Sequence, residues 1–536
     1  MSAPHPLPRL LRDAPGSSLA GVYTRAAAWY LLGVSLFWML GIEGIYEHPF
    51  PFYGLISPVF TSLSAPALAI ALVLLVCGLA AKLLTKPSHA FYIAAGIAAL
   101  AGAVAFLSES LGEGTVAAAL QGLMPLPWFL LTLSIFAVSL FGYAWTMIGS
   151  DWFGAGPGLR ETRWMLIGLA IFAFVFPASV AMLRDGPEAI SQAYERLAYE
   201  YINDIGLGGS IRGLFRDYVS LHPYLSLHAQ VHPPGPIAIL WILSYVAGRE
   251  PMGLSLASMA LGALSVFPMY LWARELFERR TAITCTALYS LVPSIVLFTA
   301  TSADITFMPF TLTTLFLFQR AINRSSLPYA LAAGICYGLL AIISFSLISI
   351  GVYFGLVGLL HLIKPGARRG AIQTASAMVA GLLLLQGAVW WWSGFDIIEV
   401  FQLSKEKFDT DQGLLDIHDP RLPSWAWKFG NPACWFFFAG IPISVLFVWR
   451  LYRADHGHRA LFYMIALTLV AFDILYLARG EGERSAMYVM PFLVIPAGHL
   501  LDEFGAAARS PVPFIVTAAF LGIQSWAIES ILYTYW

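Results

Sequence analysis

The stretch Leu225–Pro236, LSLHAQVHPPGP, leads into an apolar run over residues 237–246 and fixes how the chain enters it. Its two consecutive prolines each hold φ at about −65° and lack a backbone N–H, so the chain must turn before the apolar run begins. The same stretch places two imidazoles, His228 and His232, beside this rigid step. A polar turn that carries two histidines at the edge of an apolar run indicates a site at the membrane boundary.

The composition of the whole chain sets its class. Of 536 residues, 59% are hydrophobic and only 11% are charged, and the mean hydropathy is +0.73. Apolar runs of about 17–25 residues, long enough to cross a bilayer, recur along the chain. Among these expected spans are 127–149, 281–299, 372–393 and 433–450. The sequence therefore excludes a soluble globule and predicts an all-α, polytopic membrane protein with about fifteen transmembrane helices.

Net charge and cysteine content exclude further classes. The net charge of −1 gives no basis for a nucleic-acid partner. The four cysteines are far apart in the sequence, which argues against a disulfide framework or a zinc site. The partners that the composition predicts are membrane lipids.

The distribution of basic residues predicts the orientation of the chain in a cell inner or plasma membrane. Basic clusters such as Lys82/Lys86, Arg279/Arg280 and Arg368/Arg369 fall on one side if the N-terminus is cytoplasmic and the first apolar run is a retained helix. This holds only if the short run 237–247 is a re-entrant or juxtamembrane helix, because one more crossing would invert every later basic loop.

The chain divides into two parts with two large outer loops. Residues 1–160 form four expected helices with short outer loops, interpreted as an added membrane module. Residues 161–536 form the expected working unit, with large outer loops at 184–251 and 394–432.

Each large outer loop has a segment that predicts a juxtamembrane helix. In the first loop, five apolar residues recur at helical spacing and favour one amphipathic helix on the membrane surface, namely Ile190, Ala193, Tyr194, Leu197 and Tyr201. A second surface helix is expected through 396–408.

Ionisable residues of the outer side form the candidate site. Chemistry at an outer leaflet needs a general base, cations for a phosphate leaving group and an apolar groove for a lipid tail. Asp204 is a candidate base, and Asp304 and Asp473 are candidates because an acid at membrane depth is costly unless it is paired. Arginines for the phosphate are Arg212, Arg216 and Arg484. The remaining polar candidates are Asp217, Tyr218, His222, His228, His232 and Arg479.

Several of these motifs occur in an order that resembles a known superfamily. A loop acid precedes His-Pro-Pro-Gly at 232–235, then an apolar helix that ends in YLWARELFERR at 270–280. Next come SLVPS at 290–294 and an acid at the start of the following helix. This order over residues 161–505 resembles the GT-C integral-membrane glycosyltransferases, which include the protein O-mannosyltransferases and the lipid A aminoarabinose transferase.

The resemblance implies a glycosyltransferase that moves a sugar from a polyprenyl-phosphate carrier to an acceptor on the extracytoplasmic face. A single displacement by a glycan, lipid or protein acceptor would invert the anomeric centre. Among the matching positions, Asp204 and Asp304 correspond to catalytic acids. The expected ligands of the carrier phosphate are His228, His232, Arg216 and Arg484.

The sequence departs from the superfamily pattern in two places. Many relatives have two adjacent acids in the first loop, where this chain has Asn203-Asp204. A divalent cation is therefore left open, and no cofactor is firmly implied. A lysine that relatives often carry in a later outer turn is replaced here by Ser344-Phe-Ser346, so the phosphate must be neutralised by arginine or by a cation.

Structural roles are the alternatives for single residues. Asp204 is equally interpreted as a loop aspartate, Asp304 as a helix cap, and His232 as a residue that holds the loop. Arg479 and Arg484 are interpreted as interface anchors that pair with the intervening glutamates.

For the whole chain, the alternative function is a multi-pass transporter or lipid flippase with proton-coupled buried acids. The clustering of acids at one face, not at the midplane, favours the enzyme. A polymerase or ligase of lipid-linked glycans shares this topology.

Overall fold

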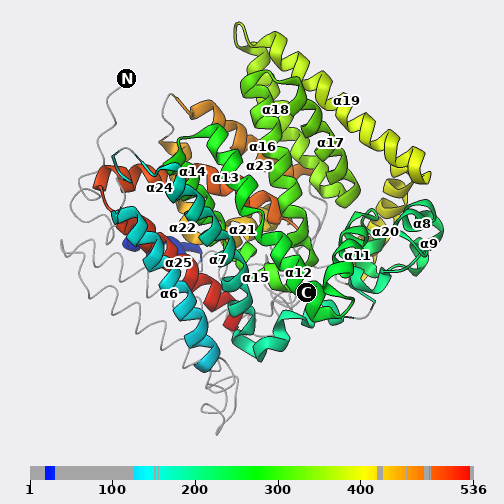
Figure 1. Cartoon of the computed structure of the whole chain (residues 1–536), viewed down its shortest axis with the longest axis horizontal. Coiled ribbons are helices and arrows are strands. Elements are labelled where there is room, and N and C mark those ends of the chain that lie inside the picture. Colours follow the sequence, from blue (N-terminus) through cyan, green and yellow to red (C-terminus); the bar gives the residue numbers. More distant parts are fainter. Residues whose placement is uncertain are drawn as a thin grey trace.

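The computed structural model describes residues 19–30, 126–149, 152–154, 156–196, 198–418, 427–453, 457–475, 482 and 484–531. Within these ranges the chain is helical and contains no strand (Figure 1). Seven helices are long and apolar enough to cross a membrane, or up to nine if each of two bent helix pairs counts as one span. The predicted all-α, multi-pass membrane fold is confirmed.

Some sequence predictions lie outside the described residues. Most of the expected N-terminal module falls in 31–125, so its first three helices and the total of about fifteen stay predictions. Its fourth expected helix, 127–149, is α6 (Leu126–Gly149). The module boundary at residue 160 is likewise untested.

The described helices follow one another in chain order. They are α6 (Leu126–Gly149), α7 (Leu159–Asp185), α8 (Ile211–Arg216), α9 (Tyr218–Leu221), α10 (Leu227–Gln230), α11 (Gly235–Ala247), α12 (Pro251–Ala263), α13 (Val266–Leu276), α14 (Arg279–Tyr289), α15 (Pro293–Thr301), α16 (Met308–Arg324), α17 (Leu327–Ile343), α18 (Gly351–Ile363), α19 (Arg368–Ser393), α20 (Ile397–His418), α21 (Trp427–Ala439), α22 (Ile441–Tyr452), α23 (Arg459–Leu475), α24 (Met490–Ala508) and α25 (Val512–Ile531). Short 3-10 segments lie between them, at η1 (Gly186–Ile190), η2 (Gln192–Glu195), η3 (Tyr201–Asp204), η4 (His222–Tyr224), η5 (Ala303–Phe307), η6 (Phe345–Ile350) and η8 (Met487–Val489).

The packed centre of the molecule joins helices from distant parts of the chain. α16 packs between α13 and α17, and α24 packs against both α14 and α22. Trp272 of α13 is fully buried, and its ring meets Tyr353 of α18 and Phe492 of α24 edge to face. Such aromatic pairs each contribute about 0.5–1.5 kcal/mol beyond area burial. These contacts hold the helices whose ends carry the candidate site.

Two of the predicted spans are broken helices. The expected span 281–299 is α14 and α15, bent by 53°, and the expected span 433–450 is α21 and α22, bent by 109°. The sharper bend occurs at Gly440, whose φ of +98° is one that side-chain-bearing residues rarely adopt. The apolar runs therefore predicted the position of both segments but not the bend within each of them.

The first outer loop differs from the prediction. In place of one amphipathic helix over 190–201, the chain forms the separate 3-10 turns η1, η2 and η3. Tyr194 and Tyr201 are buried, and η1 and η2 pack on α12. A left-handed residue, Ala198 at φ +69°, interrupts the segment. The apolar residues of η1 and η2 are therefore spaced for packing against α12 and not for an amphipathic helix. The prediction of a surface helix here is wrong.

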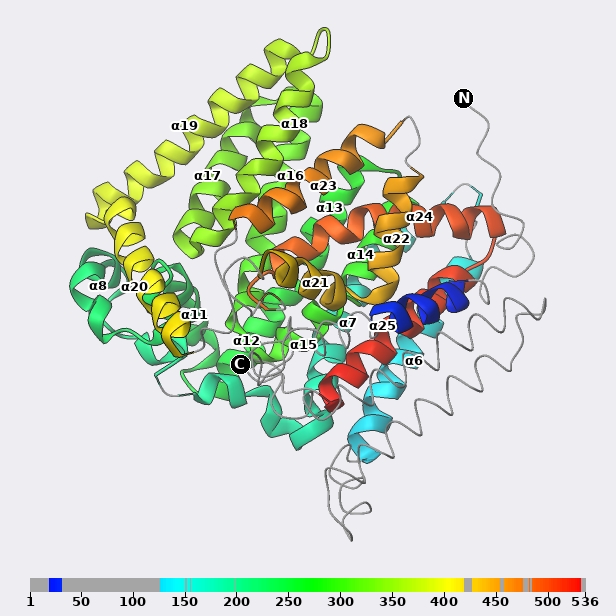
Figure 2. The ribbon, with the colours of Figure 1, turned by 180° about the vertical axis from the view of Figure 1, so that it is seen from behind.

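The loop face is the part of the molecule formed by residues 186–250, 303–307 and 394–418. Figures 1 and 2 show α8, α9, α11 and α20 gathered at the C-terminal end of the long helix α19. α20 extends well beyond the expected 396–408. α11 has 13 residues and is shorter than the helices that can cross, as the basic-residue pattern required.

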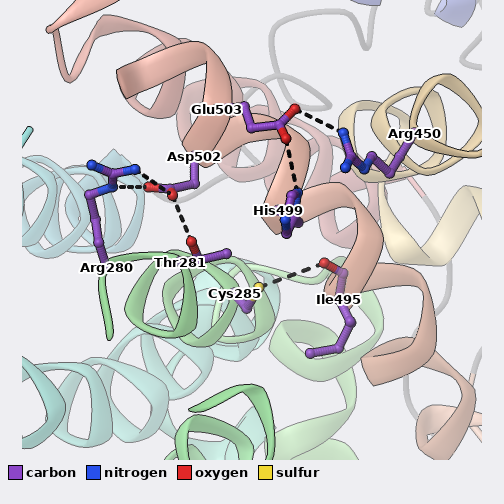
Figure 3. A network of polar contacts seen from close by, with 8 residues as sticks. All are labelled: Arg280, Thr281, Cys285, Arg450, Ile495, His499, Asp502 and Glu503. Atoms are coloured by element: carbon purple, nitrogen blue, oxygen red, sulfur yellow. Dashed lines mark hydrogen bonds and ion pairs between the residues drawn. The ribbon is translucent and has the colours of Figure 1, made fainter. Parts of the chain in front are cut away.

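A polar network lies at the opposite end of the bent span that leads to the loop face (Figure 3). The guanidinium of Arg280 donates to both carboxylate oxygens of Asp502, at 2.8 and 3.2 Å, and the hydroxyl of Thr281 donates to one of them at 2.7 Å. The buried Arg450 pairs with Glu503 at 2.8 Å. The network ties α24 to α14 and α22.

Candidate functional site

The His-Pro-Pro-Gly turn is held against the end of α17. A Cβ at Gly235 would lie only 2.3 Å from the carbonyl oxygen of Ile342, so glycine permits the close approach of the two helices. The hydroxyl of the buried Tyr218 lies 2.7 Å from the carbonyl oxygens of Ala229 and His232. Tyr218, a secondary candidate from the sequence, thus supports the backbone that carries His232.

Asp204 is buried in the loop face. Its side chain accepts hydrogen bonds from the backbone N–H of Ser226 at 3.0 Å and from the hydroxyl of Ser226 at 2.6 Å, one at each oxygen. Burial raises the pKa of Asp204 above its usual value, and the two bonds from Ser226 oppose that rise. Asp204 therefore joins η3 to the start of α10, and its predicted role as the base is not tested by these contacts.

A backbone bridge brings Glu200 beside His228. The N–H groups of Leu227 and His228 donate to the carbonyl oxygens of Ala198 and Tyr199, at 2.8 and 3.2 Å. Nδ1 of His228 then lies 3.4 Å from Oε1 of Glu200. Glu200 Oε1 makes no hydrogen bond of ordinary geometry, so the 3.4 Å contact brings the carboxylate and the imidazole together without a hydrogen bond between them.

The ring of Tyr201 lies between two histidines, with centroid distances of 6.0 Å to both His228 and His232. His232 is enclosed, and its Nδ1 has no hydrogen-bond partner. Burial, followed by electrostatic interactions with His228 and Arg484, lowers the pKa of His232 to about 3. His232 is therefore neutral at physiological pH.

Asp304 and Arg484 meet at the same place from distant parts of the chain. The hydroxyl of Ser302 accepts from the backbone N–H of Asp304, which starts η5 ahead of α16. Nε of Arg484 lies 3.8 Å from Oδ2 of Asp304, and the two side chains are 7% and 14% exposed. The predicted convergence of an outer acid and a late arginine is present in the geometry.

Tyr201 connects these groups into one site. Burial raises its pKa well above the usual value, the charge of Asp304 adds to that rise, and the charge of Arg484 opposes it. We name as the loop-face cluster the residues Glu200, Tyr201, His228, His232, Asp304 and Arg484. The cluster combines carboxylates, imidazoles and one guanidinium, the groups that proton transfer and phosphate binding require.

Other candidates lie apart from this cluster. Arg216 and Asp217 pair with each other in a two-pronged contact at 2.7–2.8 Å, on an exposed part of α8. Their ion pair holds the pKa of Asp217 below its usual range. Arg479 lies outside the described residues. The carrier-phosphate role of Arg216 stays a prediction.

Asp473 lies in the last turn of α23. The ammonium of Lys428 donates to its backbone carbonyl oxygen at 2.8 Å and to that of Ile474 at 3.2 Å, which satisfies the end of this helix. Oδ1 of Asp473 is buried without a hydrogen bond. No contact recorded for Asp473 reaches the loop-face cluster.

Glu200 and Tyr201 are the two members of the cluster that the sequence did not single out as site residues. Glu200 lies four residues before Asp204, and only the pairing of 198–199 with 227–228 brings it to His228. Glu200 and His228 are 28 positions apart, so no helical or strand periodicity relates them. Nothing in the sequence except the presence of an acid at position 200 indicated this contact.

Metal binding finds no support in the described part of the chain, where no group of three or more histidine, cysteine, aspartate or glutamate side chains is arranged to hold an ion.

The fold and the site together define a multi-pass, all-helical membrane protein with a buried ionisable cluster at one end of its helices. Residues 231–392 match the family model described as dolichyl-phosphate-mannose-protein mannosyltransferase. The matched part begins at the His-Pro-Pro-Gly turn and ends in α19, and it confirms the expected resemblance to the GT-C glycosyltransferases for this stretch. A comparison with curated proteins finds no match to the chain.

Solved structures similar to this chain include the Archaeoglobus fulgidus oligosaccharyltransferase. The form with Zn and sulfate is 16% identical, with a TM-score of 0.38, and the match covers 56% of this chain and 44% of that one. The form described as AglB with an inhibitory peptide and a dolichol-phosphate is 14% identical, with a TM-score of 0.42, covering 69% and 56%. The matches thus span about half the length of those structures.

Proposed function

We propose that this protein is a glycosyltransferase that moves a sugar from a polyprenyl-phosphate carrier to a hydroxyl-bearing acceptor on the extracytoplasmic side of the membrane. The observation that carries the proposal is the convergence of Asp304, Arg484 and the two histidines in one buried cluster at the loop face. The family match over 231–392 supports it.

Arg484 is proposed to bind the phosphate of the carrier. In the transfer, the acceptor oxygen forms a bond to the anomeric carbon while the bond from that carbon to the phosphate oxygen breaks. Negative charge then grows on the leaving phosphate, and a guanidinium fixed in a buried place stabilises that charge. Asp304, 3.8 Å from Nε, holds the guanidinium in position. One displacement of this kind inverts the anomeric centre.

His232 is proposed to contribute a neutral donor to the same phosphate. An imidazole with a pKa of about 3 carries no charge at pH 7, and its hydrogen-bonding nitrogen Nδ1 is unpaired. A donor left without a partner in a buried place is costly, and a bound phosphate oxygen would satisfy it. Asp204 is the sequence's candidate for the base that takes the acceptor proton.

Transfer by purified protein tests the proposal. Protein in lipid nanodiscs, given a radiolabelled polyprenyl-phosphate sugar and a mixture of glycan acceptors, should release polyprenyl phosphate and labelled product. Arg484→Gln should lower turnover by about 10²–10³-fold, as loss of one fixed charge-stabilising donor does. The matched control is Arg369→Gln, an exposed arginine at the start of α19, which should retain normal turnover.

A transporter would give a different result in the same system. Reconstituted into vesicles, it would move the lipid-linked sugar across the bilayer with the glycosidic bond intact. Movement without cleavage, in the presence of acceptor, contradicts the proposed function.

A further inference from the structure

Accessibility separates the proton acceptors of the first outer loop. Asp204 has a relative exposure of 2%, and Ser226 donates to both of its oxygens. The side chain of Glu200 is 5% exposed, whereas that of His228 is 15% exposed. Of these three groups, the imidazole is the one that an acceptor reaches, and the carboxylate of Glu200 lies behind it.

The imidazole has the arrangement of a positioned base. Its Nδ1 faces Glu200 Oε1 at 3.4 Å, so the other ring nitrogen, Nε2, is left to take a proton. A carboxylate behind the imidazole fixes its tautomer and stabilises the imidazolium that forms, as in hydrolase triads. Hydrogen bonds of this kind are often long before substrate binds, which fits the distance seen here.

The backbone around this pair is strained. Ala198 has φ of +69°, a left-handed conformation that is unfavourable for a residue with a side chain and that persists where surrounding contacts impose it. The carbonyl oxygens of Ala198 and Tyr199 accept the N–H groups of Leu227 and His228. The strained turn therefore sets Glu200 opposite His228.

We propose that His228 is the general base that takes the proton of the acceptor hydroxyl, and that Glu200 is its positioning residue. This inference rests on the sugar transfer proposed above. The acceptor O–H proton passes to Nε2 while the oxygen attacks the anomeric carbon. The electron pair of the broken bond leaves on the carrier phosphate, and the imidazolium afterwards releases its proton to that phosphate or to water.

The pH–rate profile distinguishes a proton-transfer role from a structural one. The titratable groups around the imidazole are Glu200, Tyr199, Tyr201 and His232, and beyond Tyr201 lie Asp304 and Arg484. Glu200 is the carboxylate in direct contact with His228. In Glu200→Gln the imidazolium loses this counter-charge, so the acid limb of the profile should move to lower pH, and kcat should fall.

Substitution of the base gives the second measurement. His228→Ala should lower kcat by about 10²–10⁴-fold, the usual contribution of one positioned general base, and added imidazole should restore part of the activity. Binding of the polyprenyl-phosphate sugar, measured by quenching of intrinsic fluorescence, should stay within about threefold of the parent protein. Glu188→Gln, an exposed acid of the same loop, is the control for carboxylate loss.

Defined outcomes overturn the inference. If His228→Ala keeps near-normal turnover while Asp204→Asn abolishes it, the base is Asp204 and sugar transfer still stands. If Glu200→Gln lowers kcat with an unmoved pH profile, Glu200 is structural. Should His228→Ala fail to fold, the profile of Glu200→Gln decides alone. Absence of transfer by the parent protein overturns the proposed function itself.

Discussion

His232 shows how much of the site depends on the burial of single side chains. The His-Pro-Pro-Gly motif drew attention to this residue in the sequence, but its neutrality at physiological pH follows from burial beside Arg484, which no motif records. The surroundings of Asp204 and Glu200 likewise depend on the fold and not on a motif. They are four positions apart, and the donors of Ser226, 22 residues after Asp204, occupy one carboxylate and leave the other beside a histidine.

The lowered pKa of His232 predicts a loss of stability in acid. Its folded value of about 3 lies below its ordinary value of 6.5, so between these pH values the unfolded loop binds a proton that the folded loop does not. Stability contributed by neutral His232 is therefore present above pH 6.5 and is lost as the pH falls toward 3. The protection of the backbone amides of 225–235 against hydrogen exchange, corrected for the pH dependence of the intrinsic exchange rate, should therefore fall between pH 7 and pH 5.

His232→Gln is the comparison for this prediction, because glutamine does not titrate. The raised pKa of Asp204 acts in the opposite direction, since its folded form holds a proton more readily than its unfolded form, but it is present in both proteins. An equal acid-induced loss of corrected protection in the variant and the parent would show that His232 is not the group responsible.

At the scale of elements, apolar runs predicted where helices lie, and packing decided their shape. The expected run 372–393 is the C-terminal part of α19, because a lipid-facing helix needs little beyond apolar length. The first outer loop was predicted as one helix from the same kind of periodicity. In that loop, the spacing of the apolar residues reflects their contacts with α12. The sequence of the loop alone does not reveal these contacts.

The approach of α11 to α17 gives a prediction at this scale. Gly235→Ala places a methyl group against the backbone of Ile342 and Ile343, so the two helices must separate. Forced overpacking of this kind costs about 1–3 kcal/mol, and the shift would carry His232 with it. Thermal unfolding in detergent should show a lower midpoint, together with weaker binding of the lipid-linked sugar.

Gly387→Ala provides the matched control, since a Cβ at this position of α19 meets nothing within 4 Å. Alanine should leave the midpoint unchanged or raise it slightly, because glycine is the poorer helix former. Equal midpoints for the two variants would mean that the contact between α11 and α17 does not require glycine.

The whole molecule brings together residues that the sequence keeps far apart. Asp304 and Arg484 are 180 positions apart and meet at 3.8 Å, because α13 packs against both α16 and α14, and α14 packs against α24, so that the four helices form one body. The superfamily resemblance pointed to both residues. Both charges also act on the pKa of the Tyr201 phenol, a proximity that only the fold reveals, because these three residues are far apart in the sequence.

The polar network of Figure 3 is predicted to hold that body together. In Asp502→Asn, Arg280 keeps its partly buried charge but loses its carboxylate partner. Breaking a buried pair by removing one partner costs about 3–5 kcal/mol, so the thermal midpoint in detergent should fall clearly. Asp409→Asn, which removes the acid of an exposed pair with Lys405 on α20, should change it little. Because the network lies at the far end of the bent span from the loop-face cluster, folded Asp502→Asn should keep the pH–rate profile of the parent. A shifted profile would mean that the two ends are coupled.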